Sequence, residues 1–162
     1  MISLQPLKRA DQKSHCPVNF ALETFGDAWS LLIVRDIVFF GKRTYTEFLN
    51  SGERISTNIL SRRLVHLERN GIIFRTPDSR DNRRDLFGLT EKGLAVIPFL
   101  LEMAGWAARS DERTTAPMEF VNSVYADRDN MYNAISEHIR GGGSLFGERP
   151  FYRPDLKLSN DQ

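Results

Sequence analysis

Apolar residues near the start of the chain recur at helical spacing, and glycines mark where the helices should end. A short helix is expected over residues 18–25, followed by Gly26. Asp27 can accept hydrogen bonds from the free N–H groups of a second helix, which should run to about Phe40 before Gly41. This second helix is apolar on most of its sides, and such a helix belongs in a protein core.

The next two segments predict a pair of helices joined by a short turn. Thr44 and Glu47 have the spacing of a capping box, in which each side chain satisfies a free N–H group at the start of a helix. That helix should end near Asn50, and Ser56 can cap a longer helix over residues 56–70. Four apolar residues of the longer helix are expected to form its buried stripe, namely Ile59, Leu60, Leu64 and Leu67.

Two β-prone runs follow, at residues 72–76 and 85–89, and a segment rich in turn-forming residues, 77–84, separates them. They predict a β-hairpin with a polar tip. A single helix is then expected over residues 91–109, bent where Pro98 interrupts its hydrogen bonding. The resulting fold class is mainly α with a small β-hairpin.

The pattern is weaker beyond residue 110. Apolar positions over residues 118–140 fit a helix that breaks near 127–130, and the tail at 144–162 is expected to lie extended on the surface. The chain is accordingly divided into a flexible arm (1–15), a main domain (16–109) and a C-terminal extension (110–162).

Composition narrows the class of protein. Of 162 residues, 41% are hydrophobic and 27% are charged, as in ordinary globular proteins. With one cysteine and three dispersed histidines, no metal site or other cofactor is expected. The first residues lack the apolar stretch of a signal peptide, and every apolar run is much shorter than a membrane span. A cytoplasmic protein without a membrane partner is therefore expected.

The net charge of +1 hides an uneven distribution. Residues 42–84 contain ten Lys/Arg and five Asp/Glu, whereas residues 110–162 contain six basic and nine acidic residues. A basic segment in a nearly neutral protein suggests a local binding site for a polyanion such as DNA. A solvated charged face fits the charge alone equally well.

The helices at 44–50 and 56–70 have the spacing of a helix-turn-helix, whose second helix enters the major groove of DNA. The first turns of that second helix offer side chains for reading base edges, namely Thr57, Asn58, Ser61 and Arg62. Asn can pair with adenine and Arg with guanine. Arg43, the helix start at Thr44, and Arg63 are better placed for phosphate contacts, which fix register. A plain surface helix with a polar outer face is the alternative.

The hairpin that follows would serve as the wing of a winged helix-turn-helix. Arg80, Arg83 and Arg84 surround its predicted tip. Arginines are attracted to the negative potential of narrow minor grooves, so this ribbon is expected to contact the neighbouring minor groove. The alternative is an ordinary solubilising loop, since nearby aspartates offset much of its charge.

The helix after the hairpin carries apolar residues at spacings of three and four, like a short heptad seam. With Trp106 beside it, this seam suggests a dimer interface between terminal helices, formed by Leu94, Ile97, Leu101, Ala104, Trp106 and Ala108. A homodimer would also read two half-sites one DNA turn apart. On pattern alone, the seam fits equally well as packing inside its own subunit.

Cys16 lies between His15 and Pro17, just ahead of the first predicted helix. A helix N-terminus and a neighbouring histidine both favour the reactive thiolate, so Cys16 is a candidate redox sensor. The alternative is a partly buried small residue with no chemical role.

Seven short motifs occur in a fixed order, at residues 16–18, 29–33, 35–36, 42–48, 55–64, 67–73 and 89–93. Together they resemble the HxlR-type regulators, relatives of the MarR winged-helix proteins, over about residues 15–108. The resemblance implies a bacterial, cytoplasmic homodimer that acts on an operator near its own or neighbouring genes. It also implies that residues 56–70 form the recognition helix and 77–84 the wing tip, and Cys16 matches a cysteine that senses oxidants in some members. The extension beyond residue 110 exceeds the family's usual length.

Two other functions compete with that of a DNA-binding transcriptional regulator. No constellation of catalytic residues stands out in the sequence, so an enzyme is not expected. A winged helix used only for protein–protein contacts is the alternative, but it should lose its arginines and expose apolar residues. The sequence therefore predicts a homodimer on an inverted-repeat, double-stranded DNA operator, with an effector that the residues do not identify.

Overall fold

The computed structural model describes residues 14–153. The chain forms two compact units. The first unit comprises Met1–Ile37 and Lys42–Leu94, and the second comprises Val38–Gly41 and Ala95–Gln162. Each unit is described by itself. The expected arm at residues 1–15 lies almost wholly outside the described residues, as does the end of the tail.

The first unit begins with the helices that the sequence predicted. Helix α1 spans Pro17–Phe25, and α2 spans Ser30–Phe40. The last residues of α2, from Val38 onward, belong to the second unit. The Asp27 carboxylate accepts hydrogen bonds from the backbone N–H groups of Trp29 (2.8 Å) and Ser30 (2.9 Å), as expected of a residue that caps a helix start. Gly41 ends α2 in the left-handed conformation, with φ of 70°.

The predicted helix pair is confirmed. Helix α3 spans Tyr45–Leu49, and both halves of the capping box between Thr44 and Glu47 are present. Helix α4 spans Thr57–Arg69 and is capped by the Ser56 side chain. Leu60, Leu64 and Leu67 are buried as expected, but the prediction for Ile59 was wrong, since 37% of it is exposed. It lies a third of a turn from Leu60, on the edge of the buried stripe.

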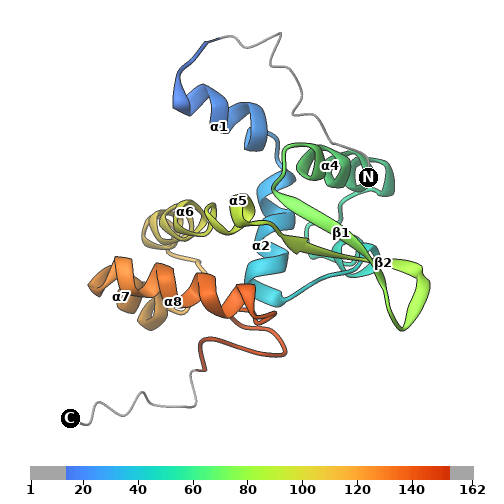
Figure 1. Cartoon of the computed structure of the whole chain (residues 1–162). Coiled ribbons are helices and arrows are strands. Elements are labelled where there is room, and N and C mark those ends of the chain that lie inside the picture. The colour runs from blue at the N-terminus through green and yellow to red at the C-terminus, as the bar shows by residue number, and fades with distance from the viewer. Residues whose placement is uncertain (1–13, 154–162) are drawn as a thin grey trace. The chain divides into compact units, whose positions relative to one another are not determined.

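The hairpin is longer than predicted. Strand β1 spans Ile73–Asp78 and β2 spans Asp81–Leu89, so pairing continues through most of the segment expected to be loop, and only residues 79 and 80 form the turn. A register shift after Pro77 accommodates the proline in the ladder. Figure 1 shows this two-stranded ribbon extending away from the helices of its own unit.

The core of the first unit lies between α2, α3, α4 and the base of the hairpin. Its fully buried side chains include Val34 and Ile37 from α2, Phe48 from α3 and Leu67 from α4. Phe48 also meets Phe87 of β2 edge to face, with ring centroids 5.9 Å apart. The backbone N–H of Phe87 donates to the carbonyl of Arg43 (2.7 Å), which ties the hairpin base to the start of α3.

The prediction of a single bent helix over residues 91–109 is wrong. The chain instead forms α5 over Glu91–Leu94 and a separate α6 over Ile97–Ser110. Pro98 lies in the first turn of α6, where its missing N–H costs nothing, so it begins a helix instead of bending one. Gly93 is required in α5, because a side chain there would meet the carbonyl oxygen of Ile72 at 2.1 Å.

The second unit is built around α6. Helix α7 (Met118–Ala126) and α8 (Arg128–Arg140) pack against it, and the predicted break near residue 127 is confirmed. The Tyr125 ring is stacked between the guanidinium groups of Arg109, at 3.9 Å, and Arg128, at 4.2 Å. Gly105 makes room for that ring, since a side chain there would lie 2.6 Å from it.

The chain after α8 does not follow the extended surface path that was predicted. Leu145 is fully buried, and its N–H donates to the carbonyl of Val38 (2.8 Å) within the same unit. Phe146 packs edge to face on both Phe39 and Phe120. Aromatic burial therefore folds this part of the tail onto the end of α2, and the three aromatic residues of the tail were the signal for it in the sequence.

Candidate nucleic-acid interface

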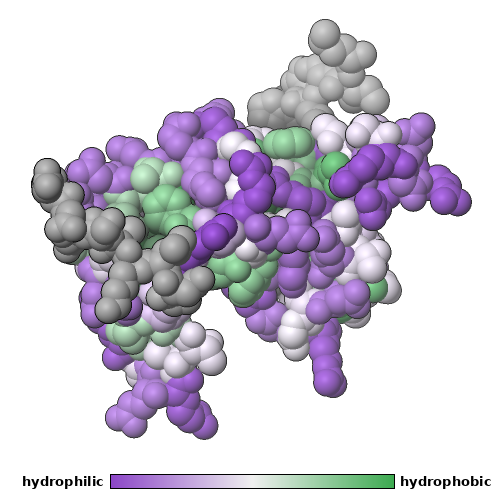
Figure 2. Space-filling view, turned by 90° about the horizontal axis from the view of Figure 1, so that it is seen from below, coloured by the Kyte–Doolittle hydropathy of each residue, from purple (hydrophilic) through white to green (hydrophobic). Residues whose placement is uncertain are grey.

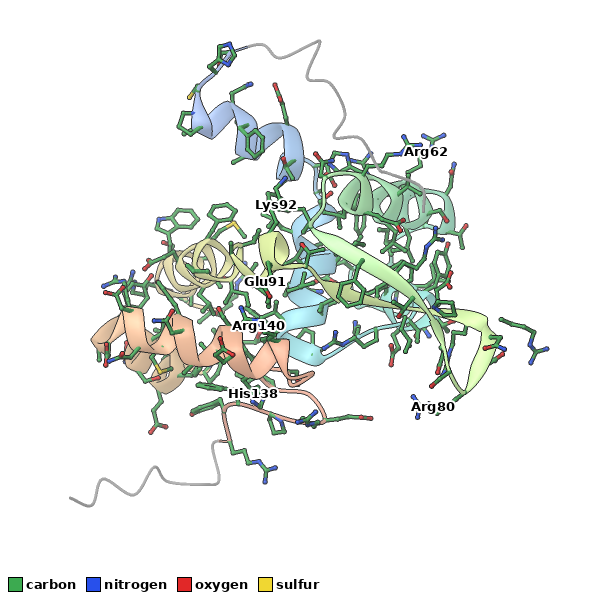
Figure 3. All side chains as sticks on the ribbon, viewed as in Figure 1. Arg62, Arg80, Glu91, Lys92, His138 and Arg140 are labelled. Carbon is green, nitrogen blue, oxygen red and sulfur yellow. The ribbon has the colours of Figure 1, made fainter. Side chains whose placement is uncertain are left out.

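One side of α4 presents a continuous exposed stripe. Residues three and four apart share a helix face, and five exposed side chains follow this rule: Asn58, Ser61, Arg62, Val65 and Arg69. Arg62 projects outward from the helix (Figure 3). Within residues 14–153, neither Arg62 nor Arg69 forms an ion pair, so both guanidinium groups are available for a ligand. Thr57 is also exposed, at the start of the helix.

Tyr45 of α3 holds the first turns of α4 in place. Its hydroxyl donates to the backbone carbonyl of Thr57 (2.9 Å), and its oxygen lies 3.1 Å from the Ser61 hydroxyl. The Ser61 hydroxyl, predicted to read bases, therefore already has an intramolecular partner. Sequence reasoning missed Tyr45, although an aromatic ring with a polar tip directly after a capping threonine was the available signal.

Arg63 points to the other side of α4, toward the junction of α1 and α2. It forms an ion pair with Asp27 (3.1 Å), and the neighbouring His66 bonds to the Thr24 carbonyl (2.9 Å). Burial opposes ionisation of Asp27, but hydrogen bonds from Ser30, Trp29 and Arg63 outweigh it and hold the pKa of Asp27 below its usual value. The structure thus places Arg63 in a contact that anchors α4, away from the stripe.

A buried carboxylate organises the turn between α3 and α4. Asp36 accepts hydrogen bonds from Lys42 Nζ (2.9 Å), from the Ser51 hydroxyl and from Arg35 Nε (3.0 Å). Arg35 also binds Glu53 in the turn, and this contact lowers the pKa of Glu53 to about 2. The turn is therefore attached to α2 by charged groups. The sequence showed only that Arg35 and Asp36 were the charged residues of an apolar helix.

The wing arginines are paired within the hairpin. Arg84 binds the buried Asp78 carboxylate through Nε (3.1 Å) and Nη2 (2.5 Å), and Arg80 Nε lies 3.6 Å from the same carboxylate. Arg83 Nε lies 3.3 Å from Asp81. The backbone N–H of Arg80, followed by the Arg84 side chain, holds the pKa of Asp78 below its usual value.

These pairings distinguish the three wing arginines. Arg80 occupies the turn (Figure 3), whereas Arg83 and Arg84 lie on β2 instead of at the tip. The side chains of Arg80 and Arg83 are 82% and 92% exposed despite their partners, and that of Arg84 is half exposed. Arg80 and Arg83 can therefore turn toward a ligand, while Arg84 supports the hairpin.

The predicted phosphate contacts at the start of α3 find less support. Thr44 is buried within the capping box, and the Glu47 carboxylate accepts the N–H groups of both Arg43 and Thr44 (2.8 Å each). An anion would meet this carboxylate at the helix start. Arg43 is half-buried, and burial lowers the pKa of its side chain.

The seam predicted for a dimer interface is largely covered within one chain. On α6, Ile97, Leu101 and Ala108 are buried and Ala104 is half-buried, and α7 and α8 pack against this helix. Leu94 is also buried, but it lies in α5, which packs against β2. Trp106, in contrast, is 67% exposed. Phe99 and Met103 are also exposed, and their spacing places them with Trp106 on one face of α6.

Cys16 is exposed and occupies the N-cap position of α1, directly before Pro17. In the described part of the chain, no group of His, Cys, Asp or Glu residues could hold a metal ion. None of the described helices is long and apolar enough to span a membrane.

The helix pair with its hairpin has counterparts in known proteins. A family model of HxlR-like helix-turn-helix proteins matches residues 24–115. The chain belongs to this family. It is 28% identical over 104 residues to YdeP, an HTH-type transcriptional regulator of Bacillus subtilis, covering 64% of this chain and 80% of YdeP.

Solved structures give the same result. The structure of a MarR-family transcriptional regulator from Porphyromonas gingivalis W83 superposes with a TM-score of 0.51 and 28% identity, covering 58% of this chain and 91% of the other. The redox regulator HypR in its oxidized form superposes with a TM-score of 0.53 and 26% identity, covering 61% of this chain and all of HypR. The protein is thus a winged helix of the HxlR and MarR type, a class of DNA-binding transcriptional regulators.

Proposed function

We propose that this HxlR-type regulator binds an inverted-repeat operator as a homodimer, with α4 in the major groove. The observation that carries the proposal is the exposed stripe of α4, where Arg62 and Arg69 have no carboxylate partner within the described residues. Asn58 lies in the first turn of the same stripe. Asn offers bidentate contacts to adenine and Arg to guanine, which is the chemistry of sequence reading.

The wing has a different part in the proposal. Arg80 and Arg83 would contact the backbone or the neighbouring minor groove, since their side chains are almost fully exposed. Arg84 would act indirectly, by holding the hairpin through Asp78. Thr57 remains a candidate base contact, while Arg63 and Thr44 would act by orienting the helix pair.

The homodimer would use the exposed apolar face of α6. Apolar residues come to the surface in limited patches among hydrophilic ones (Figure 2), so a row of three large ones on a single helix is unusual. Phe99, Met103 and Trp106 form this row. A second copy is the expected partner, because reading an inverted repeat requires two copies related by two-fold symmetry. This interface replaces the buried seam.

Light scattering after size exclusion tests the dimer. The full chain is expected to elute as a dimer, and Trp106→Glu, which places a charge in the row, should elute as a monomer with unchanged helical content. Asn122→Glu introduces the same charge at an exposed position of α7 and should remain a dimer. A monomeric parent protein, or a dimer unaffected by Trp106→Glu, contradicts this interface.

Fluorescence anisotropy tests the operator. The protein is titrated into a duplex from its own upstream region and into a scrambled duplex, over a series of salt concentrations. Binding that prefers the upstream duplex and weakens steeply with salt is expected of a sequence-reading regulator. Equal, weak binding to both, followed by failure to enrich any sequence from random DNA, would overturn the proposal in favour of a winged helix that contacts other proteins.

We further propose that oxidation of Cys16 weakens operator binding. The similarity to the redox regulator HypR, the exposed thiol and its position at the start of α1 support this role. The end of α1 contacts α4 through Thr24 and His66, which offers a route from the cysteine to the DNA-reading helix. Mild hydrogen peroxide, which converts the thiolate to a sulfenate and releases water, should lower operator affinity.

The Cys16→Ser variant separates this role from general oxidative damage. Its operator affinity should equal that of the reduced parent before and after peroxide, and dithiothreitol should restore the parent. An identical peroxide response in the serine variant would remove Cys16 from consideration, since the chain's four methionines are then the remaining targets.

A further inference from the structure

We propose that Val65 is a specificity-determining residue that recognises the C5-methyl group of a thymine in each operator half-site. The inference rests on the proposed function, because it takes α4 as the helix that enters the major groove. It adds a chemical requirement on the ligand, namely that the bound DNA carries a thymine methyl opposite the third turn of α4.

Val65 lies at the centre of the exposed stripe of α4. Ser61 and Arg62 precede it by four and three residues, and Arg69 follows it by four, so all of them share one helix face. The same residues, with His66, line a shallow concave surface. The valine is therefore surrounded by the side chains that would meet DNA.

The exposure of Val65 is not explained by the packing of the protein. Its side chain is 42% exposed, whereas the apolar residues at the core face of α4 are buried. Single exposed apolar residues are common on protein surfaces. Val65 differs from those because its neighbours on the stripe are two arginines that have no ion-pair partner among residues 14–153, and a ligand that binds these arginines must also cover the valine.

The chemistry of the major groove limits what can lie opposite such a residue. Base edges in that groove present hydrogen-bond donors and acceptors, and the C5-methyl of thymine is the apolar group among them. A valine set against a donor or acceptor would remove water without replacing its hydrogen bond, which costs affinity. Set against a methyl group, the valine gains from removing apolar surface from water.

Ser61 does not compete for this contact. Its hydroxyl already has a partner within the chain, the Tyr45 hydroxyl oxygen at 3.1 Å. Ile59, the other exposed aliphatic residue of α4, lies outside the stripe and provides a matched comparison. An effect confined to Val65 would therefore be due to its position on the face that meets DNA.

Deoxyuridine provides the sharpest test, because it differs from thymidine only by the absence of the C5-methyl. An operator enriched from random DNA by the full-length protein is prepared with each thymine replaced singly by deoxyuridine, and affinities are measured for the parent, Val65→Ala and Ile59→Ala. For the parent, replacement at one position of the half-site should weaken binding about threefold to tenfold. Val65→Ala should weaken binding to the thymine operator by a similar factor.

The decisive result is the combination of the two changes. Val65→Ala should bind the thymine and deoxyuridine operators equally, while Ile59→Ala should keep the parent's preference for the methyl group. Val65 is exposed, so the melting temperature of Val65→Ala should match the parent and exclude misfolding. If the alanine variant keeps the full thymine preference, or if no replacement affects the parent, Val65 does not read a methyl. Failure to enrich any DNA sequence would instead overturn the proposed function itself.

Discussion

Helix α4 and the wing both carry arginines, but the two regions use them differently. On α4, Arg62 and Arg69 stand exposed without carboxylates to bind within residues 14–153. On the hairpin, each of Arg80, Arg83 and Arg84 lies beside an aspartate of the same hairpin. Counting basic residues therefore overestimates the positive charge that the wing can offer to DNA. The same count gives a better estimate for the exposed stripe of α4.

The difference follows from the secondary structure on which the arginines lie. The backbone groups of a helix are satisfied by hydrogen bonds within the helix. The outward-facing side chains of α4 are therefore not needed to hold its shape and can bind DNA. A two-residue turn between long strands needs local bonds, and Asp78 supplies them by accepting from the Arg80 N–H (2.9 Å) and from Arg84. The wing aspartates thus stabilise the shape of the ribbon at the expense of its positive charge.

The largest effect is expected from Arg62→Ala. Removing this exposed side chain should cost about 1–3 kcal/mol of binding to the cognate operator and relax the preference at one base pair, without changing the unfolding free energy. Arg113→Ala removes an exposed arginine from the loop after α6 and serves as the control. Anisotropy titrations against cognate and random duplexes provide the measurement. Equal losses on both duplexes would reassign Arg62 to phosphate binding.

The next effect should come from Asp78→Ala. Loss of this buried carboxylate leaves the Arg80 N–H and the Arg84 guanidinium without their partner, so the end of the hairpin should open more often. Hydrogen exchange of the β1 and β2 amides should speed up near the turn, and wing-dependent DNA affinity should fall. Asp81→Ala, which removes a more exposed partner, should have the smaller effect. Equal rates of amide hydrogen exchange in the Asp78→Ala and Asp81→Ala variants would contradict the special role of Asp78.

A smaller and less specific effect is expected from Arg83→Ala. Its side chain is almost fully exposed, so its loss should weaken binding to all sequences uniformly and reduce the slope of log affinity against log salt by about 1. Arg84→Ala should instead accelerate hydrogen exchange in the hairpin, because Arg84 binds Asp78. An unchanged salt slope for Arg83→Ala would show that its pairing with Asp81 persists on DNA.

The smallest effect concerns pH. The folded pKa of Asp78 lies below the unfolded value of 3.8, so its stabilising contribution is fully present above that value and is lost as pH falls through the folded pKa. NMR spectra recorded from pH 6 to pH 2 should show the Arg80 amide shifting at the acid end, and Asp78→Asn should abolish that transition. A shift centred above 3.8 would contradict the lowered pKa.

The sequence predicted the helix boundaries correctly where they are set by contacts between residues close together in the chain. The capping box of Thr44 and Glu47 and the cap at Ser56 act between residues three apart, and Gly41 and Gly71 end the helices they follow. Leucines at helical spacing located the core side of α4. The motifs were therefore sufficient to recognise the HxlR type, because a helix-turn-helix is assembled from neighbouring segments.

Only the tertiary structure decided the contacts between distant residues. The sequence could not show that the hydroxyl groups of Tyr45 and Ser61 form a hydrogen bond. Nor could it show the ion pairs between Asp27 and Arg63 and between Asp78 and Arg84. It also could not show that α7 and α8 cover the seam of α6 and leave Trp106 exposed. A residue's type and spacing fix which contacts it is able to make, but the partner it finds depends on which segments the fold brings beside it.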